Sequence, residues 1–94
     1  MGYEELQITW DEAKNLSNIA KHNISFEEAA TVFRDGLSIT TDDPEHSQDE
    51  ERFATIGLSA QGRLMVISHT LEPDLIRIIS ARKPTRKERE DYES

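Results

Sequence analysis

Basic side chains gather in the second half of an otherwise acidic chain. Residues 1–51 carry 13 acidic and 3 basic side chains, whereas residues 52–94 carry 6 acidic and 8 basic ones. The net charge of −8 therefore divides into −10 and +2. Because salt screens charges that lie more than about 8–10 Å apart, a local basic field can bind phosphate on an acidic protein. A solvated surface of mixed charge is the alternative explanation.

Arg77 stands out among these side chains because it interrupts the apolar run Leu75–Ile79. A charged side chain in a central strand must reach water, a carboxylate or the phosphate of a ligand. Phosphate binding is one interpretation, and an ion pair with Glu50 or Glu51 is the other. Arg52 directly follows acidic residues and has the same two explanations.

The C-terminal segment carries a second group of arginines. Arg82, Arg86 and Arg89 fall at positions i, i+4 and i+7 if a helix runs from Arg82, and Tyr92 follows one turn later. Guanidinium groups form paired hydrogen bonds with phosphate, and an aromatic ring can stack on a base. This segment therefore has the composition of a phosphate clamp.

A polar stripe is predicted on the first helix. Lys14, Asn18 and Lys21 stand at i, i+4 and i+7, with His22 beside them. The stripe lies opposite the helically spaced apolar residues, which are Ala13, Leu16, Ile19 and Ala20. A solvated helix face would have a similar composition, so binding and solvation both remain open here.

Two further candidates belong to one predicted strand. Arg63 and His69 alternate with Met65 and Ile67, so the four side chains share one face of a sheet. His69 has a second explanation as a half-buried structural histidine.

Local signals give the elements that must position these residues. Asp11 is a predicted N-cap, and Ser25 with Glu28 and Thr85 with Glu88 have capping-box spacing. The predicted order is a strand Leu6–Trp10, a helix from Asp11 to Asn23, a helix from Ser25 to Asp35, a strand Leu37–Thr41, an exposed loop Thr41–Glu51, strands Arg52–Ala60, Arg63–Thr70 and Leu75–Ala81, and a helix from Thr85 to about Glu93.

This order predicts an α+β fold in one domain spanning residues 1–94. Three consecutive strands with short connections form an antiparallel meander, and two N-terminal helices and one C-terminal helix pack around it. The predicted core contains Phe26, Phe33, Ile56, Leu64, Val66 and Ile78.

Several classes of protein and site are not expected. The chain has no cysteine and only 3 histidines at wide spacings, so neither a disulfide framework nor a structural zinc site is predicted. The N-terminus lacks the features of a signal peptide, and no run approaches the roughly 18 apolar residues that span a membrane. We expect a cytoplasmic protein that needs no metal, no cofactor and no membrane.

The chain resembles BrnT-type toxins from about Ile8 to Tyr92. The matching residues are Trp10-Asp11-Glu12-Ala13-Lys14, Asn18, Lys21-His22, Phe26-Glu27-Glu28-Ala29, Val32-Phe33, Glu51-Arg52, Gly57, Gly62-Arg63-Leu64, Val66, Arg77-Ile78-Ile79-Ser80-Ala81-Arg82-Lys83, Glu88-Arg89 and Tyr92. Asn23 stands where the family usually has glycine and Pro84 where it commonly has alanine, and neither is a candidate functional residue.

The resemblance implies a RelE-like fold and an endoribonuclease that acts as the toxin of a bacterial type II toxin–antitoxin pair. It also implies neutralisation, in a heteromeric complex, by an antitoxin that carries a DNA-binding domain. The pair would repress its own operon and contact operator DNA only through the antitoxin.

Metal-free RNA cleavage uses the ribose 2′-OH as the nucleophile on the adjacent phosphorus and needs a base, an acid and cationic groups. We assign phosphate binding to Arg77 and Arg82, proton transfer to Lys21 or His22, and stacking or acid catalysis to Tyr92. The second rank of predicted RNA-binding residues is Lys14, Arg52, Arg63, His69, Arg86 and Arg89.

Two other functions are compatible with the sequence. One is a module of the same fold that binds a protein target without nuclease activity, and the other is a regulatory partner of a DNA-binding protein. The acidic composition favours both, because nonspecific RNA affinity depends on contacts between cations and phosphates.

Overall fold

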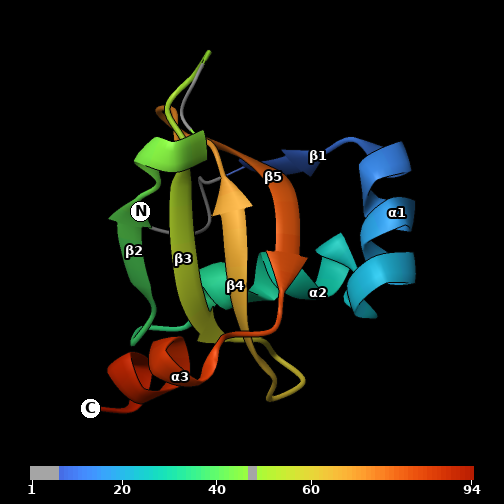
Figure 1. The fold of residues 1–94 in the computed structure, drawn as a ribbon. Coiled ribbons are helices and arrows are strands. Elements are labelled where there is room, and N and C mark those ends of the chain that lie inside the picture. Colours follow the sequence, from blue (N-terminus) through green and yellow to red (C-terminus); the bar gives the residue numbers. More distant parts are fainter. Residues whose placement is uncertain (1–6, 47–48) are drawn as a thin grey trace.

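A mixed sheet in the order β1-β5-β4-β3-β2 forms the centre of the protein (Figure 1). The computed structural model describes residues 7–46 and 49–94, so Leu6, the first residue of the expected strand, lies outside the described residues. The strands are β1 (Gln7–Trp10), β2 (Ile39–Asp42), β3 (Phe53–Leu58), β4 (Leu64–His69) and β5 (Leu75–Arg82).

The predicted antiparallel meander is confirmed, and it extends to the four strands from β2 to β5. The pairing of β1 was not predicted: it lies parallel to β5, with Gln7 opposite Leu75 and Trp10 opposite Ile78. A parallel pair cannot be joined by a tight hairpin, and here the chain between β1 and β5 runs through α1, α2 and the other three strands. The fold class is therefore α+β with a mixed sheet.

The three helices begin at the expected caps. They are α1 (Glu12–His22), α2 (Phe26–Ala30), which continues as a 3₁₀ turn (Thr31–Arg34), and α3 (Arg86–Glu93). The Asp11 carboxylate accepts from the Lys14 amide, and α1 ends at Asn23, whose φ of 58° is left-handed. Both reciprocal bonds of the capping box join Thr85 and Glu88.

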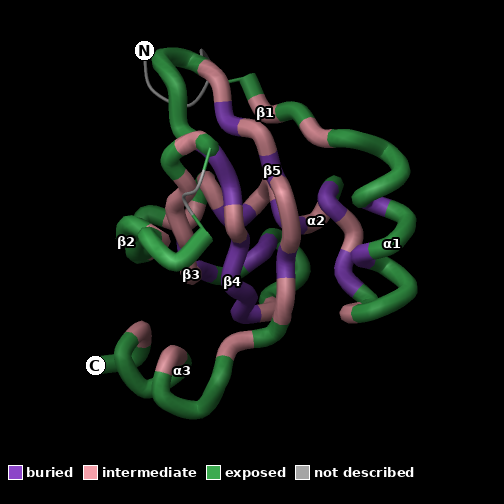
Figure 2. The backbone as a smooth tube through the Cα atoms, turned by 45° about the horizontal axis from the view of Figure 1, so that its top comes forward, coloured by how far each residue is buried: buried purple, intermediate pink, exposed green. Residues whose placement is uncertain are grey.

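The core lies on the sheet face that α2 covers (Figure 1). Strand β4 is among the most buried segments (Figure 2). The buried cluster consists of Ile24, Phe26, Ala29, Val32, Met65, Ile67, Ile76, Ile78 and Ala81. Phe26, Ile78, Leu64 and Val66 are buried as predicted, although Leu64 and Val66 lie outside this cluster. Ile56 and Phe33 are half-buried.

Helix α1 packs against the sheet with the side opposite to the one that its apolar pattern predicts. Asn15 and Asn18 are buried, whereas Leu16 is 61% exposed. The reason is that β1 pairs with β5 only as far as Ile78. Beyond that point the Asn18 side chain replaces a strand neighbour: its amide nitrogen donates to Ala81 O (2.9 Å) and its oxygen accepts from Ala81 N (3.1 Å).

A bulge in β5 controls which side chains face the open side of the sheet. Ser68 pairs with Ser80 and His69 pairs with Ile78, so Ile79 is the extra residue. Side chains alternate along a strand, and one inserted residue changes the face of everything that follows. The bulge therefore places Ser80, and Arg82 two residues later, on the face opposite the buried Ile78 and Ala81.

Candidate functional site

A hollow of about 230 Å³ lies on the sheet face opposite α2. Its charged and polar lining comes from three parts of the chain: the β2–β3 connection, β4 and β5. These residues are Asp43, His46, Arg52, Ser68, Ser80 and Arg82. The volume is below the roughly 300–1,000 Å³ of pockets that enclose a small ligand. The geometry therefore fits an extended ligand that contacts the surface with one group, such as a phosphate.

A second hollow of about 160 Å³ lies between α1 and β5. Lys14, Lys21 and His22 line it together with Ile79 and Ser80. Ile79 and Ser80 also line the first hollow, so the two meet at the β5 bulge. The structure thus brings the predicted groups of α1 next to the hollow that contains Arg52 and Arg82.

Arg82 forms a two-point ion pair with the C-terminal helix. Its two terminal nitrogens donate to the two carboxylate oxygens of Glu88, at 2.8 and 2.9 Å. The hydrogen bond from Arg82 is the main reason that the pKa of Glu88 is lowered to about 2. Glu88 is therefore ionised at neutral pH, and a phosphate that binds Arg82 must compete with it.

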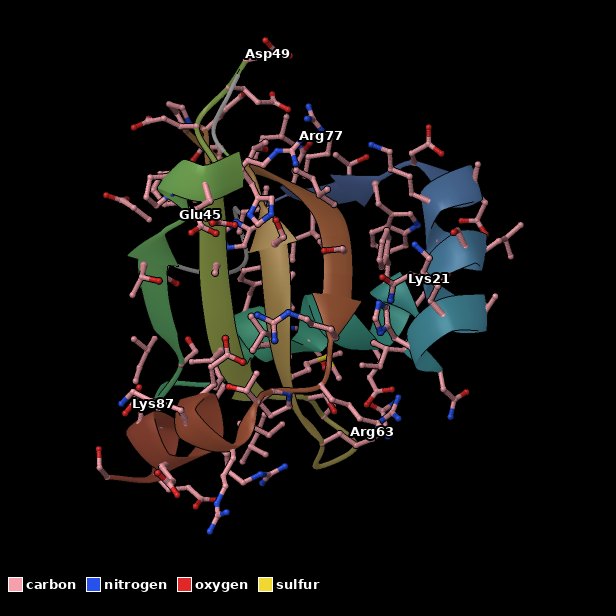
Figure 3. The ribbon with its side chains drawn as sticks, in the orientation of Figure 1. Lys21, Glu45, Asp49, Arg63, Arg77 and Lys87 are labelled. Carbon is pink, nitrogen blue, oxygen red and sulfur yellow. The ribbon has the colours of Figure 1, made fainter. Side chains whose placement is uncertain are left out.

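Arg77 points away from the buried Ile76 and Ile78 but lines neither hollow. Its guanidinium forms an ion pair with Glu50, one of the two carboxylates considered above. In Figure 3 it lies at the end of the sheet near Asp49, apart from Lys21. The expected convergence of Arg77 with Arg82 in one hollow is not seen.

Arg63 lies at the opposite end of the sheet from Arg77 (Figure 3). Its guanidinium donates to Glu28 (2.5 and 2.9 Å) and to the Asn23 carbonyl (3.1 Å). This pairing is the main reason that the pKa of Glu28 is lowered. Arg63 therefore ties the β3–β4 turn to the end of α1 and the start of α2.

The arginines of α3 do not continue the line of Arg82. Arg82 belongs to β5, and the helix begins only at Arg86, so the helical spacing of Arg82, Arg86 and Arg89 does not exist. Arg86 and Arg89 instead face Glu90 and Glu93 across single turns, both at 3.6 Å. Exposed pairs of this kind contribute a few tenths of a kcal/mol.

His69 is buried in the core, with 1% of its surface exposed. Its Nδ1 lies 2.9 Å from the Thr70 carbonyl and its Nε2 lies 2.7 Å from the Thr55 hydroxyl. A carbonyl only accepts, so Nδ1 carries the proton. Burial lowers the pKa of His69, which favours the neutral ring. Phe33 packs edge-on against this ring, with 4.9 Å between the centroids, so RNA cannot reach it in this conformation.

Tyr92 connects α3 to the segment before β2. Its hydroxyl donates to Asp35 Oδ2 at 2.6 Å, and Asp35 also accepts from the Leu58 amide at 2.8 Å. The hydrogen bond to Asp35 raises the pKa of Tyr92 to about 12. A hydroxyl with this partner is well placed to hold α3. Its raised pKa makes it a weak proton donor.

The predicted set omits His46 and Asp43, although both line the first hollow. The signal available in the sequence was that Asp43 and His46 are three residues apart. Pro44 favours the first position of a short helical turn, and Pro44–His46 forms a 3₁₀ turn that brings residues three apart together. The acidic composition of the loop concealed this pattern.

Within residues 7–46 and 49–94, no three histidine, aspartate or glutamate side chains are arranged to hold a metal ion. The same residues contain no helix with the length and apolarity required to span a bilayer.

Comparison with known proteins agrees with this architecture. The crystal structure of the Brucella abortus ribonuclease toxin BrnT is similar, with a TM-score of 0.56 and 22% sequence identity over 86% of this chain and 99% of that one. No curated protein sequence matches the chain. The model of the BrnT family, described as the ribonuclease toxin of a type II toxin–antitoxin system, matches residues 10–88. The chain therefore belongs to the BrnT family of ribonuclease toxins.

Proposed function

We propose that the chain is an endoribonuclease that cuts RNA without a metal ion or cofactor, through attack of the ribose 2′-OH on the adjacent phosphorus. The observation that carries this proposal is the junction of two hollows at Ile79 and Ser80. Arg52 and Arg82 lie on one side of the junction, and Lys21 and His22 lie on the other. Guanidinium groups stabilise developing phosphoryl charge, and groups across the phosphate can exchange protons.

The proposal includes the partners that a toxin of this family requires. A DNA-binding antitoxin would neutralise the chain in a heteromeric complex, and the pair would repress its own operon through contacts between antitoxin and operator. The site of action would be the cytoplasm.

Labelled RNA incubated with the purified chain in EDTA is expected to be cut, leaving a 2′,3′-cyclic phosphate and a 5′-OH. DNA of the same sequence should remain intact because it lacks the 2′-OH, and one 2′-deoxy substitution at a cleaved position should protect that position. Electrophoresis of the products measures the result. Addition of the antitoxin should stop the reaction. Absence of cleavage in every condition that keeps the chain folded would overturn the proposal.

Replacement of Tyr92 by phenylalanine is expected to lower the free energy of unfolding by about 1 kcal/mol, because one hydrogen bond is lost. The cleavage rate should stay within about twofold, since the hydroxyl is committed to Asp35. Melting curves and cleavage rates on the same preparation test both statements. A loss of about 100-fold in rate at unchanged stability would instead assign the hydroxyl a role in acid catalysis.

One observation favours a second function, that of a binding module without catalysis. Arg63, Arg77 and Arg82 each form an ion pair with a carboxylate, as structural arginines do. In that case the antitoxin complex would form normally, while purified chain would leave RNA intact.

A further inference from the structure

His46 is an exposed histidine at the edge of the Arg82 hollow. Its side chain is 62% exposed, in contrast to the buried His69. The short turn that Pro44 begins also closes through the backbone, because the His46 amide donates to the Asp43 carbonyl at 3.2 Å. The sequence thus holds this ring on the open face of the sheet, where a ligand can reach it.

The Asp43 carboxylate orients the ring. Asp43 Oδ2 lies 2.9 Å from His46 Nδ1. An ionised carboxylate only accepts hydrogen bonds, so the pairing assigns the proton to Nδ1. In the neutral imidazole the lone pair is then on Nε2, the nitrogen opposite Asp43. A histidine with this orientation is prepared to accept a proton at Nε2.

The same hollow supplies phosphate-binding groups. Arg52, Arg82 and the hydroxyls of Ser68 and Ser80 line it together with His46 and Asp43. Asp43 is also close enough to Arg82 to contribute to the raised pKa of that guanidinium, after the larger effect of Glu88. A histidine with an oriented ring and two guanidinium groups therefore line one hollow.

We propose that His46 is the general base of the cleavage reaction and that Asp43 is its positioning residue. This inference rests on the proposed ribonuclease function and deepens it. His46 Nε2 removes the proton of the 2′-OH while the 2′ oxygen forms its bond to phosphorus. The bond between phosphorus and the 5′ oxygen breaks, and that oxygen takes a proton from an acid. The products are a 2′,3′-cyclic phosphate and a 5′-OH.

The position of the β5 bulge indicates which group acts as the base and which groups act as the acid. In-line displacement places the attacking and leaving oxygens on opposite sides of the phosphorus. His46 lies in the first hollow, whereas Lys21 and His22 lie in the second, beyond Ile79 and Ser80. The base therefore acts from the Arg82 side, and the α1 groups are left with the role of acid.

Replacement of His46 by glutamine is expected to lower the cleavage rate by about 100-fold or more, the usual contribution of a general base. The melting temperature should not change, because the side chain is exposed. Glu45→Gln, in the same turn but outside the hollow, is the matched control and should keep the rate within about twofold. Imidazole added to His46→Ala should restore part of the activity, which a purely structural histidine would not allow.

The role of Asp43 has its own measurement. Nitrogen NMR of the His46 ring should show the proton on Nδ1 in the wild type and a mixture of tautomers in Asp43→Asn. That variant should also cut more slowly, whereas Asp42→Asn should not. The other charged groups around His46 are Glu45, Asp49, Glu50, Arg52 and Arg82, and they stay unchanged in both variants.

The outcomes separate this inference from the function on which it rests. If the wild type cuts RNA and His46→Gln keeps at least half of its rate, the chain is a nuclease with a different base. A loss of rate that follows only from a lower melting temperature also overturns the inference. If the wild type cuts nothing, the nuclease function and the role of His46 both fall.

Discussion

Replacement of Asn18 by leucine is expected to lower the free energy of unfolding by about 3–5 kcal/mol and the melting temperature by at least about 12 °C. Leucine has a similar size but forms none of the hydrogen bonds of Asn18, which reach both backbone groups of Ala81 and the Ile24 carbonyl. Each buried group left without a partner costs about 1–3 kcal/mol. A domain of this size has only roughly 5–14 kcal/mol of stability to lose. Chemical denaturation measures the change.

The reverse substitution on the same helix is the control. Leu16→Asn adds a polar side chain where the apolar pattern of α1 predicts a core position, but the observed Leu16 is 61% exposed. We expect a cost below about 1 kcal/mol, mostly from helix propensity. If Leu16→Asn destabilises the protein more than Asn18→Leu does, the helix faces the sheet with its apolar side and the described orientation is wrong.

Replacement of Arg82 by alanine is expected to lower the rate of RNA cleavage by about 100-fold, the usual effect of removing one preorganised group from a developing charge. Arg82 lines the first hollow with Arg52, and its guanidinium can present two donors to a phosphate. Arg82→Lys should recover only part of the rate because an ammonium lacks this fork. Single-turnover cleavage with saturating enzyme measures the chemical step.

Glu88 provides the matched control for Arg82. If Arg82 serves only to hold α3, Glu88→Ala should have the same effect as Arg82→Ala, because either change breaks the same ion pair. If Arg82 binds phosphate, Glu88→Ala removes a competitor, and the rate should stay the same or rise. Equal losses in the two variants would therefore remove Arg82 from the catalytic site.

Arg77→Ala tests the other arginine to which phosphate binding is assigned. Arg77 is paired with Glu50 and lies outside both hollows. A loss of about 100-fold at unchanged stability would extend the site along β5 to this end of the sheet.

Local signals in the sequence were sufficient for much of the fold. The caps at Asp11 and Thr85 and the end of α1 at Asn23 depend only on neighbouring residues, and all three were predicted. The meander was predictable because short connections leave consecutive strands few alternatives. The partner of β1 was not predictable, because β1 and β5 are far apart in the sequence and their pairing depends on where α1 and α2 pack.

The orientation of α1 shows a clear limit of periodicity. The pattern correctly gave a helix, but it assigned the buried side to the apolar residues. The free backbone groups of Ala81 reverse this choice, since satisfying them is worth more than burying Leu16. No property of the α1 sequence alone reveals that a neighbouring strand ends early.

The candidate site could be predicted only in part, because local spacing again does not show which side chains the fold buries. The grouping of Lys14, Lys21 and His22 follows from helical spacing and survives in the second hollow. Residue type alone could not tell the buried His69 from the exposed His46, because the difference depends on which face of β4 is covered and on a turn in an acidic loop.

Helix α3 has no buried residue, and polar contacts join it to the rest of the fold. They include the pair between Arg82 and Glu88 and the hydrogen bond between Tyr92 and Asp35. Such an element opens as a separate unit, so its amide hydrogens should exchange faster than those of β4, and faster still as salt is added. Ionic strength therefore acts on Arg82 in two opposing ways: it weakens the attraction to an RNA phosphate, and it also weakens the hold of the carboxylate that occupies the guanidinium.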